Sequence, residues 1–235
     1  MALYSREFLT QKHKHYEEKF ADWHFHLMSY LGGQDYQNGY QLNRYILETD
    51  EEYLKRAENT PIDNHCKNVV QIYSSFLFRV PPTRNYGSLT GDEQLDSFIN
   101  DADLDGRSFN NVIREMQMNA SIYGTCWAVL DKPAVQTQSR AEELQLDIRP
   151  YMSLYTPENV LNWNFERSRN GKYVLTSLTL LEDLFDDMAT IRVWTMEDIT
   201  TYKVKEFTKG YSTSKPMMID EMPNQLGKVP AVILY

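Results

Sequence analysis

The spacing of apolar residues changes near the middle of this chain, and that change constrains the fold more than any other feature of the sequence. Apolar side chains recur at helical spacing through residues 61–79 and 108–123, whereas short apolar runs separated by turn residues follow from 148 onward. The first pattern is typical of amphipathic helices and the second of half-buried strands. Helices followed by antiparallel strands predict an α+β protein in which N-terminal helices pack on a small antiparallel β-sheet, and they argue against a doubly wound sheet.

The most clearly marked helix is expected over residues 61–79. Thr60 is a favourable N-cap, Pro61 fits the first helical position, and Pro81-Pro82 ends the segment. Because the apolar residues of this segment recur at helical spacing, we expect the helix to be deeply buried. The other helices are expected within 3–31 (before Gly32-Gly33), at 42–57, at 89–99, and from Ser108 to Tyr123, where Gly124 closes the helix.

The strands are expected in the second half of the chain. Asn170-Gly171 predicts a tight turn between two of them. Residues 134–147 are polar and are expected to form an exposed excursion, and residues 209–228 are expected to form a loop. The run 231–235 is apolar and directly follows a proline, which is typical of an interrupted strand, so we expect the chain to be incomplete at its C-terminus. The expected strands are 125–130, 148–155, 160–165, 173–181, 190–196, 200–207 and 229–235.

The predicted core joins the helices to the sheet. Aromatic residues make up 13% of the chain, and we expect most of them in this core and some at contacts with a neighbouring subunit. The predicted core residues are Ile62, Val69, Tyr73, Phe76, Phe109, Val112, Met116, Trp127 and Trp163.

The composition excludes several classes of protein. Hydrophobic residues make up 42% of the chain and charged residues 24%, which is incompatible with extensive disorder. The net charge is −9, from 24 basic and 33 acidic side chains, and no segment is rich in Lys and Arg. Tight binding to DNA is therefore disfavoured, because that affinity comes largely from neutralised phosphates. The sequence contains neither a membrane-spanning run nor a signal peptide, so we expect a soluble protein made in the cytoplasm.

Each of the two cysteines lies among apolar neighbours. Cys66 falls on an expected helix and Cys126 on an expected strand. Two isolated, buried thiols are typical of a reducing compartment, where cysteine behaves as a small hydrophobic residue. The spacing alone leaves a disulfide between the two open.

The segment 101–106 is the one candidate for metal binding. Asp101, Asp103 and Asp105, followed by Gly106, match the opening of a calcium-binding loop. The twelfth position of such a loop requires a bidentate Glu, and here it is Val112. An acidic turn that leads into the next helix explains these residues better, so the three aspartates stay a secondary candidate.

Other chemistry-bearing residues fit no recognised site. The pairs His13/His15 and His24/His26 are two residues apart, so on a helix each pair points to different sides and makes a poor metal site. The sequence has no nucleophile elbow and no glycine-rich phosphate loop. We therefore expect no catalytic residue and no cofactor.

A group of carboxylates lies near one expected strand end. It comprises Glu182, Asp183, Asp186 and Asp187. A solvated turn explains the group better than paired acid–base chemistry, which needs a pocket that separates two pKa values.

An ordered set of short strings distinguishes the chain further. In sequence order they are EYLKRA at 52–57, FLFRVPP at 76–82, YGTCWAVLD at 123–131, RPY at 149–151, YTPENVLNW at 155–163 and LGKVP at 226–230. In this order and at these intervals, they resemble the N-terminal part of tailed-bacteriophage portal proteins, also called head–tail connectors. The resemblance covers about residues 50–235.

This resemblance implies a structural role without catalysis. Portal subunits form a homo-oligomeric ring, usually a dodecamer, at one vertex of the capsid in the virion. Double-stranded DNA passes through the ring during packaging and ejection without tight binding, and the implied partners are the capsid protein, the terminase and a tail adaptor, with no membrane involved. We expect an N-terminal helical arm (1–49) ahead of the part that the resemblance covers. For that part, the expected segments are the helical part of a wing domain (50–133), the exposed excursion (134–147) and the antiparallel β part of the wing (148–235).

Two other functions stay open. The first is another head–tail adaptor or head-assembly interaction protein of the virion. The second is a hydrolase with an unrecognised site, which depends on the carboxylate groups alone. Assembly into a ring distinguishes the portal hypothesis from both.

Overall fold

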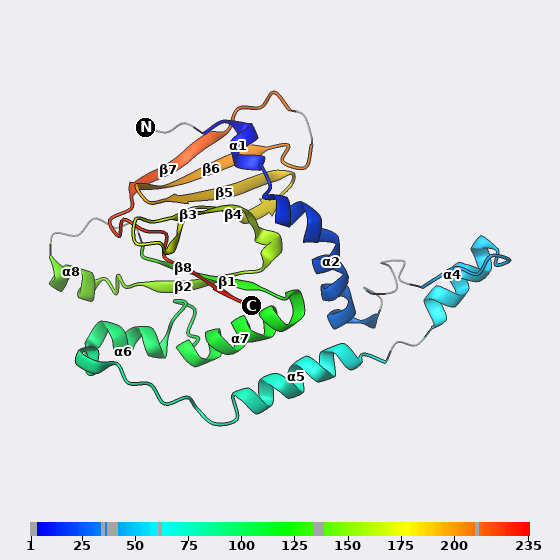
Figure 1. Cartoon of the computed structure of the whole chain (residues 1–235), viewed down its shortest axis with the longest axis horizontal. Coiled ribbons are helices and arrows are strands. Elements are labelled where there is room, and N and C mark those ends of the chain that lie inside the picture. The colour runs from blue at the N-terminus through cyan, green and yellow to red at the C-terminus, as the bar shows by residue number, and fades with distance from the viewer. Residues whose placement is uncertain (1–3, 34–35, 37–41, 61–62, 134–138, 210–211) are drawn as a thin grey trace.

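The computed structural model describes residues 4–33, 36, 42–60, 63–133, 139–209 and 212–235. It confirms an α+β protein with helices and antiparallel strands, and the strands form two sheets where the sequence predicted one (Figure 1). The helical segments are α1 (Arg6–Thr10), α2 (Lys14–Leu31), α4 (Asp50–Asn59), α5 (His65–Leu77), η1 (Gly87–Leu89), α6 (Glu93–Asn100), α7 (Phe109–Tyr123), α8 (Arg140–Gln145) and η2 (Pro157–Asn159).

The strands form a three-stranded and a five-stranded sheet. The smaller sheet has the order β2-β1-β8, built from β1 (Cys126–Asp131), β2 (Tyr151–Tyr155) and β8 (Ala231–Leu234). The larger sheet is a meander in which each strand pairs with the next along the chain. Its strands are β3 (Val160–Arg167), β4 (Tyr173–Phe185), β5 (Met188–Thr195), β6 (Asp198–Lys205) and β7 (Met217–Pro223).

Strand β1 is the centre of the layered core, because it is buried on both faces. Trp127 and Val129 point toward the five-stranded sheet, and Cys126 and Ala128 point toward α7. This alternation is the period of a strand. A third cluster lies between helices α1 and α2 and strands β5 and β6, and Trp163 packs against both this cluster and the one between the sheets.

The structure confirms part of the predicted core. Val112, Met116 and Trp127 are buried. Phe109 and Trp163 are half-buried and pack against buried clusters. Ile62 lies outside the described residues.

The predicted deep burial of the 61–79 helix is wrong. Helix α5 turns Ser74 toward the body, where the Oγ atom accepts a hydrogen bond of 3.3 Å from Arg114 of α7. Val69, Tyr73 and Phe76 are 56%, 65% and 70% exposed. The helical spacing identified an apolar face correctly, but that face points away from the rest of the described chain.

The starts of α4, α5 and α6 also differ from the predictions, since these helices begin at Asp50, His65 and Glu93 and not at residues 42, 61 and 89. Thr60 is the C-cap of α4, and Asn64 is the N-cap of α5; Pro61 lies outside the described residues. Helix α4 begins after Thr49, which forms a capping box with Glu52, so the helix expected at 42–57 starts later than predicted. The predicted helix ends at Gly32 and Gly124 are confirmed.

Strand β7 occupies a segment that the sequence analysis assigned to a loop. Its residues are mostly exposed, as is usual for a strand at the edge of a sheet, and Pro223 ends it. Pairing with β6 fixes this strand, with Thr200 opposite Glu221 and Thr201 opposite Asp220. A strand that buries little apolar surface leaves no alternating pattern in the sequence.

Candidate interaction surface

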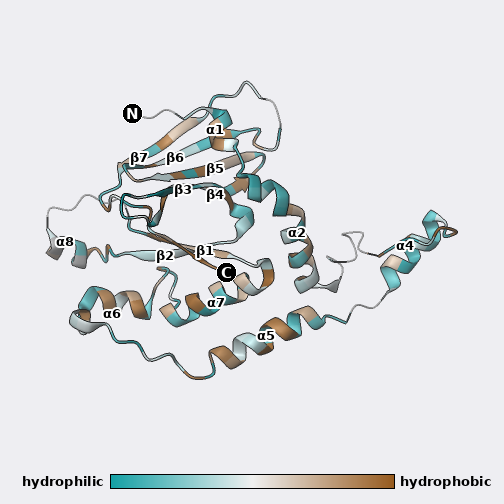
Figure 2. Ribbon diagram, viewed as in Figure 1, coloured by the Kyte–Doolittle hydropathy of each residue, from teal (hydrophilic) through white to brown (hydrophobic). Residues whose placement is uncertain are grey.

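Helix α5 presents a continuous apolar face, which we call the stripe. Successive helical residues are rotated by about 100°, so members three, four and seven positions apart lie on one side. Figure 2 shows the apolar colouring along this helix. Contiguous exposed apolar surface of this kind typically marks a site of interaction with another protein. The stripe consists of Val69, Ile72, Tyr73, Phe76 and Leu77 of α5, together with Val80, which follows the end of the helix; each is 55–70% exposed.

Polar contacts hold α5 in place at its start and its middle. Asn64 caps the helix through Oδ1, which accepts a hydrogen bond from the Lys67 N–H at 2.9 Å, and its Nδ2 donates to the Tyr30 carbonyl at 2.7 Å. A Cβ at Gly32 would lie 2.4 Å from that Nδ2 atom, so the close approach requires glycine. Together with the contact between Ser74 and Arg114, these bonds fix the helix without using the stripe.

An open hollow of about 630 Å³ adjoins the stripe. Two stripe residues, Ile72 and Phe76, form its apolar side, and Arg79 contributes a positive charge. The described lining residues are Asn68, Gln71, Ile72, Ser75, Phe76 and Arg79. This mixture suits an apolar side chain that is flanked by acidic or polar groups.

A second exposed apolar group lies on residues 42–60. We call this segment the arm; its bounds differ from those of the predicted N-terminal helical arm (1–49). Figure 1 shows α4, the helix of the arm, projecting away from the two sheets. Tyr45, Ile46 and Leu47, which we call the tip, are 68%, 100% and 94% exposed. The tip could not be predicted from the sequence, because three adjacent apolar residues in a non-helical segment show no periodicity.

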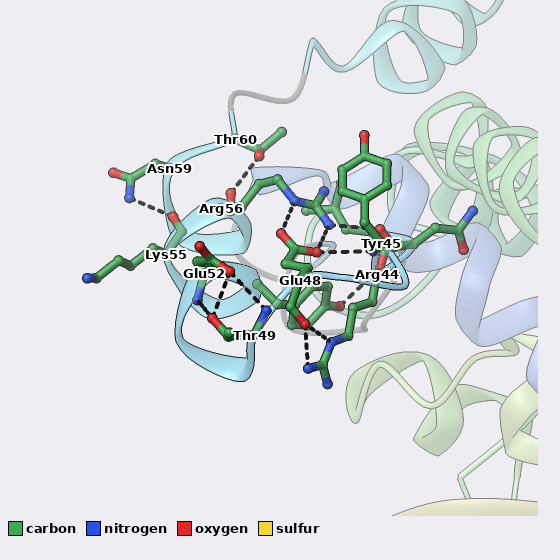
Figure 3. Close-up of polar contacts among 12 residues, drawn as sticks. Arg44, Tyr45, Glu48, Thr49, Glu52, Lys55, Arg56, Asn59 and Thr60 are labelled. Carbon is green, nitrogen blue, oxygen red and sulfur yellow. Dashed lines mark hydrogen bonds and ion pairs between the residues drawn. The ribbon is translucent and has the colours of Figure 1, made fainter.

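Arg56 organises the arm from within (Figure 3). Its guanidinium donates to both carboxylate oxygens of Glu48 at 2.7 and 2.8 Å and to the Asn43 carbonyl at 2.8 Å. It also lies 4.8 Å from the ring centre of Tyr45 and 5.5 Å from that of Tyr53. A paired, planar guanidinium between two rings fixes the segment that carries the tip.

Glu48 is the matching anion of this network. The hydrogen bonds from Arg56, together with one from the Tyr45 N–H, lower the pKa of Glu48 to about 2, although desolvation opposes the shift. The Glu48 carbonyl accepts hydrogen bonds from the Arg44 side chain at 2.7 and 3.1 Å. The arm therefore keeps its internal ion pair at neutral pH.

The acidic loop 101–106 directs two of its carboxylates to its own backbone and to arginines. Asp101 accepts hydrogen bonds from the Gly106 N–H at 2.9 Å and from Arg149 at 2.7 Å. Asp103 accepts from the Asp105 N–H and pairs with Arg107. Burial raises the pKa of Asp103, but these hydrogen bonds outweigh it and lower the pKa overall. The structure therefore brings the three predicted aspartates into one loop whose geometry their own hydrogen bonds explain.

Arg149 joins this loop to its surroundings. The side chain is 8% exposed, and it contacts Asp101, Asp147 and the Ser97 carbonyl at the end of α6. The part of the chain that the structure describes contains no group of three or more His, Cys, Asp or Glu side chains that could hold a metal ion.

The four histidines of the two predicted pairs lie on α2 or at its start. His13 is the N-cap of α2, where Nδ1 accepts a hydrogen bond from the His15 N–H at 3.1 Å, and its ring stacks on Trp163 at 4.0 Å. Desolvation, followed by the nearby His15, lowers the pKa of His13. His24 and His26 are exposed. These contacts give His13 a structural role.

The carboxylates near the end of β4 take different positions. Asp186 and Asp187 both have positive φ, at 48° and 57°, and form the tight turn between β4 and β5. Glu182 instead faces Arg192 of β5, at 3.5 Å, and accepts a hydrogen bond from Tyr155 of β2. They therefore do not form one acid–base site.

Arg192 lies at the centre of a polar bridge between the sheets. It donates to Asp131 of β1 at 2.6 Å, and Tyr151 of β2 donates to the same carboxylate at 3.1 Å. Burial, followed by the charge of Glu182, raises the pKa of Tyr155 far above its ordinary value. These side chains connect strands of the two sheets through hydrogen bonds and ion pairs, and this structural role is sufficient to explain their burial.

The cysteines differ from the sequence prediction in one respect. Both are free, but Cys66 is exposed and only Cys126 is buried. Cys66 lies on an exposed side of α5. The apolar residues near it in the sequence suggested burial, but most of them belong to the exposed stripe. Burial raises the pKa of the Cys126 thiol to about 12, which makes it unreactive at neutral pH.

The described residues contain no helix long and apolar enough to cross a membrane. The fold combines a layered core with an exposed apolar helix face and a projecting arm, an arrangement typical of proteins that contact other proteins. A family model for phage portal proteins of the SPP1 Gp6-like type matches residues 13–235. The chain belongs to this family, as its ordered sequence strings predicted. A search of the curated proteins finds no match.

Proposed function

We propose that this chain is a structural subunit of the portal ring at one vertex of the phage capsid. In that role it forms part of the conduit through which double-stranded DNA is packaged and ejected, and it provides a docking platform for the terminase and the tail adaptor. The single observation that carries the proposal is the family match over residues 13–235. The exposed stripe on α5 supports it, because an assembly subunit needs apolar surface that its own fold leaves uncovered.

We further propose that the subunit acts without catalysis and without gripping DNA. The polar clusters around Arg149 and Arg192 connect structural elements, which supports a non-enzymatic role. The net charge of −9 supports a conduit that lets DNA slide, since several Lys or Arg contacts to phosphates create a strongly salt-dependent affinity. Within the subunit, we assign residues 50–133 and 148–235 to the helical and β parts of the wing.

Imaging of the full-length gene product tests this function. Mass photometry gives the oligomer mass, and negative-stain electron microscopy gives its shape. We expect closed rings with an axial channel, and a dodecamer as the main species. Immunogold labelling of virions is expected to mark one vertex per particle. A protein that stays monomeric in both measurements and does not label virions would overturn the proposal.

A further inference from the structure

The chain exposes two apolar surfaces of opposite shape. The tip, Tyr45–Leu47, is a projection on the arm, whereas the stripe on α5 adjoins an open hollow. The tip side chains are at least 68% exposed and the stripe side chains at least 55%, so neither surface is covered by the other within one chain. A projection and a hollow that both lack a cover in the same subunit fit a contact between two copies.

We propose that the tip of one subunit docks on the α5 stripe of the next copy, with Leu47 or Ile46 beside Ile72 and Phe76. This inference rests on the proposed ring assembly and names the surfaces that make it. Because the two surfaces differ, each subunit uses its tip toward one neighbour and its stripe toward the other. Such a heterologous contact propagates head to tail and closes into a ring when the rotation between copies allows it.

The charges around the two surfaces are complementary. Residues 42–60 of the arm carry three basic and five acidic side chains, a net charge of 3 − 5 = −2. Residues 63–84, which include α5, carry three basic side chains and one acidic, a net charge of 3 − 1 = +2. Opposite charges around an apolar contact steer the approach of two copies and disfavour arm-to-arm or stripe-to-stripe pairing.

The arm also has a fixed shape before it meets a partner. The pair between Arg56 and Glu48, the rings of Tyr45 and Tyr53 around the guanidinium, and the hydrogen bond from Tyr53 to the Leu42 carbonyl at 3.0 Å all lie within residues 42–60. A surface that is already ordered loses less conformational entropy on docking. The internal network of the arm therefore favours the tip as a docking element.

Site-specific cross-linking of the full-length protein tests the contact. The background variant is Cys66→Ser, which removes the exposed native thiol and retains the buried Cys126. Leu47→Cys and Ile72→Cys are introduced into separate preparations, which are mixed and treated with a short bis-maleimide. We expect cross-linked dimers only in the mixture, and a ladder of oligomers when one chain carries both substitutions. Asn59→Cys, exposed at the far end of α4, is the matched control and is expected not to link to Ile72→Cys.

The outcomes separate the inference from the function on which it rests. Rings that assemble in the Cys66→Ser background without a link between positions 47 and 72 overturn the inference and leave the proposed portal function intact. A link between two copies of Leu47→Cys indicates a symmetric contact and also overturns it. A protein that never forms rings refutes both.

Charge substitution at the tip gives a second readout. Leu47→Asp is expected to reduce the fraction of protein in rings by about tenfold at fixed concentration, as for the loss of one interface hot spot. Its matched control, Lys55→Ala, changes an exposed arm residue away from the tip and is expected to leave assembly unchanged. Leu47 is 94% exposed, so circular dichroism of the folded subunit is expected to stay the same. Equal assembly of both variants would contradict docking through the tip.

Discussion

Two aromatic residues that the sequence placed in one core are expected to respond very differently to truncation. Phe76→Ala removes a ring from the α5 stripe, and Trp127→Ala removes a ring from the centre of β1. Phe76 is 70% exposed and Trp127 is 3% exposed. Comparing the two variants therefore tests whether the apolar face of α5 stabilises the folded subunit or is available for contact with another chain.

The structure sets the magnitude of each loss. Full burial of a Phe side chain stabilises a fold by about 1.5–3 kcal/mol, and Phe76 buries about a third of its surface, so Phe76→Ala is expected to cost about 0.5–1 kcal/mol. Trp127 lies in the cluster between the two sheets, with its ring centre 5.6 Å from that of Trp163. Removing it leaves a cavity in a layer that neighbouring strands hold apart, so about 3–5 kcal/mol is expected.

Urea unfolding monitored by far-ultraviolet circular dichroism measures both losses. The protein is kept at a concentration at which mass photometry detects only monomers, because assembly would stabilise the folded state by mass action. The shift of the midpoint at constant slope gives the change in free energy of unfolding. Equal losses for the two variants would refute the reasoning, since Phe76 would then be buried within the subunit.

Three further perturbations test the polar contacts of the fold. His13→Ala is expected to lower the free energy of unfolding by about 1 kcal/mol, measured by thermal or urea unfolding, whereas His13→Asn retains a side chain that can cap α2. Because the pKa of His13 is lowered in the folded state, its stabilising effect is complete above about pH 6.5 and is lost as the pH falls through the lowered pKa. An identical pH dependence of stability in wild type and His13→Asn would show that His13 does not cause it. Arg149→Ala is expected to cost about 2–3 kcal/mol, because it removes a buried cation from Asp101 and a hydrogen bond from the Ser97 carbonyl. Arg107→Ala is expected to cost under about 1 kcal/mol, because the Arg107 side chain is exposed and the backbone N–H groups of residues 105 and 107 still bind the Asp103 carboxylate. Equal costs would contradict the role of Arg149. In an NMR titration, the amide resonance of Tyr45, which donates to Glu48, is expected to shift with a midpoint at about pH 2, because the pKa of Glu48 is lowered from 4.5. The stabilisation from the ion pair between Glu48 and Arg56 is then complete above pH 4.5 and is lost as the pH falls toward 2. A midpoint near pH 4.5 would show that the ion pair does not form.

Helices α5 and α7 show how much of this fold the sequence could predict. Both have apolar residues at helical spacing, and the expected helix from Ser108 to Gly124 has the correct start, end and buried face. It is buried because the three-stranded sheet covers Val112 and Met116. The spacing in α5 is equally regular, but no described element covers that face. Periodicity shows that a helix has an apolar face. Which segment covers that face, if any, depends on how the distant elements of the fold are arranged.

The tip and strand β7 were missed for a related reason. Each depends on contacts that leave no local pattern: the tip is held by Arg56 through Glu48, eight residues earlier in the sequence, and β7 is an exposed edge strand defined by its pairing with β6. The capping box at Thr49 was the available signal for the arm, since a helix that begins at Asp50 leaves residues 45–47 outside it. The acidic loop shows the opposite case, in which a local pattern suggests a site that the structure explains otherwise. Its sequence matches the opening of a calcium loop, but Arg149, which is distant in sequence, pairs with Asp101, and the neighbouring Arg107 pairs with Asp103.

The division between α7 and α5 also explains how a subunit can be ordered before it assembles. Val112 and Met116 stabilise the fold of the single chain, since their burial is complete within it. Helix α5 is instead positioned by polar contacts, from Asn64 to the Tyr30 carbonyl and from Arg114 to Ser74, so its apolar residues are not needed to hold it. In the proposed docking, a subunit built this way meets its neighbour with a surface already in place. The free energy of burying that surface then stabilises the assembly and not the fold of the single subunit.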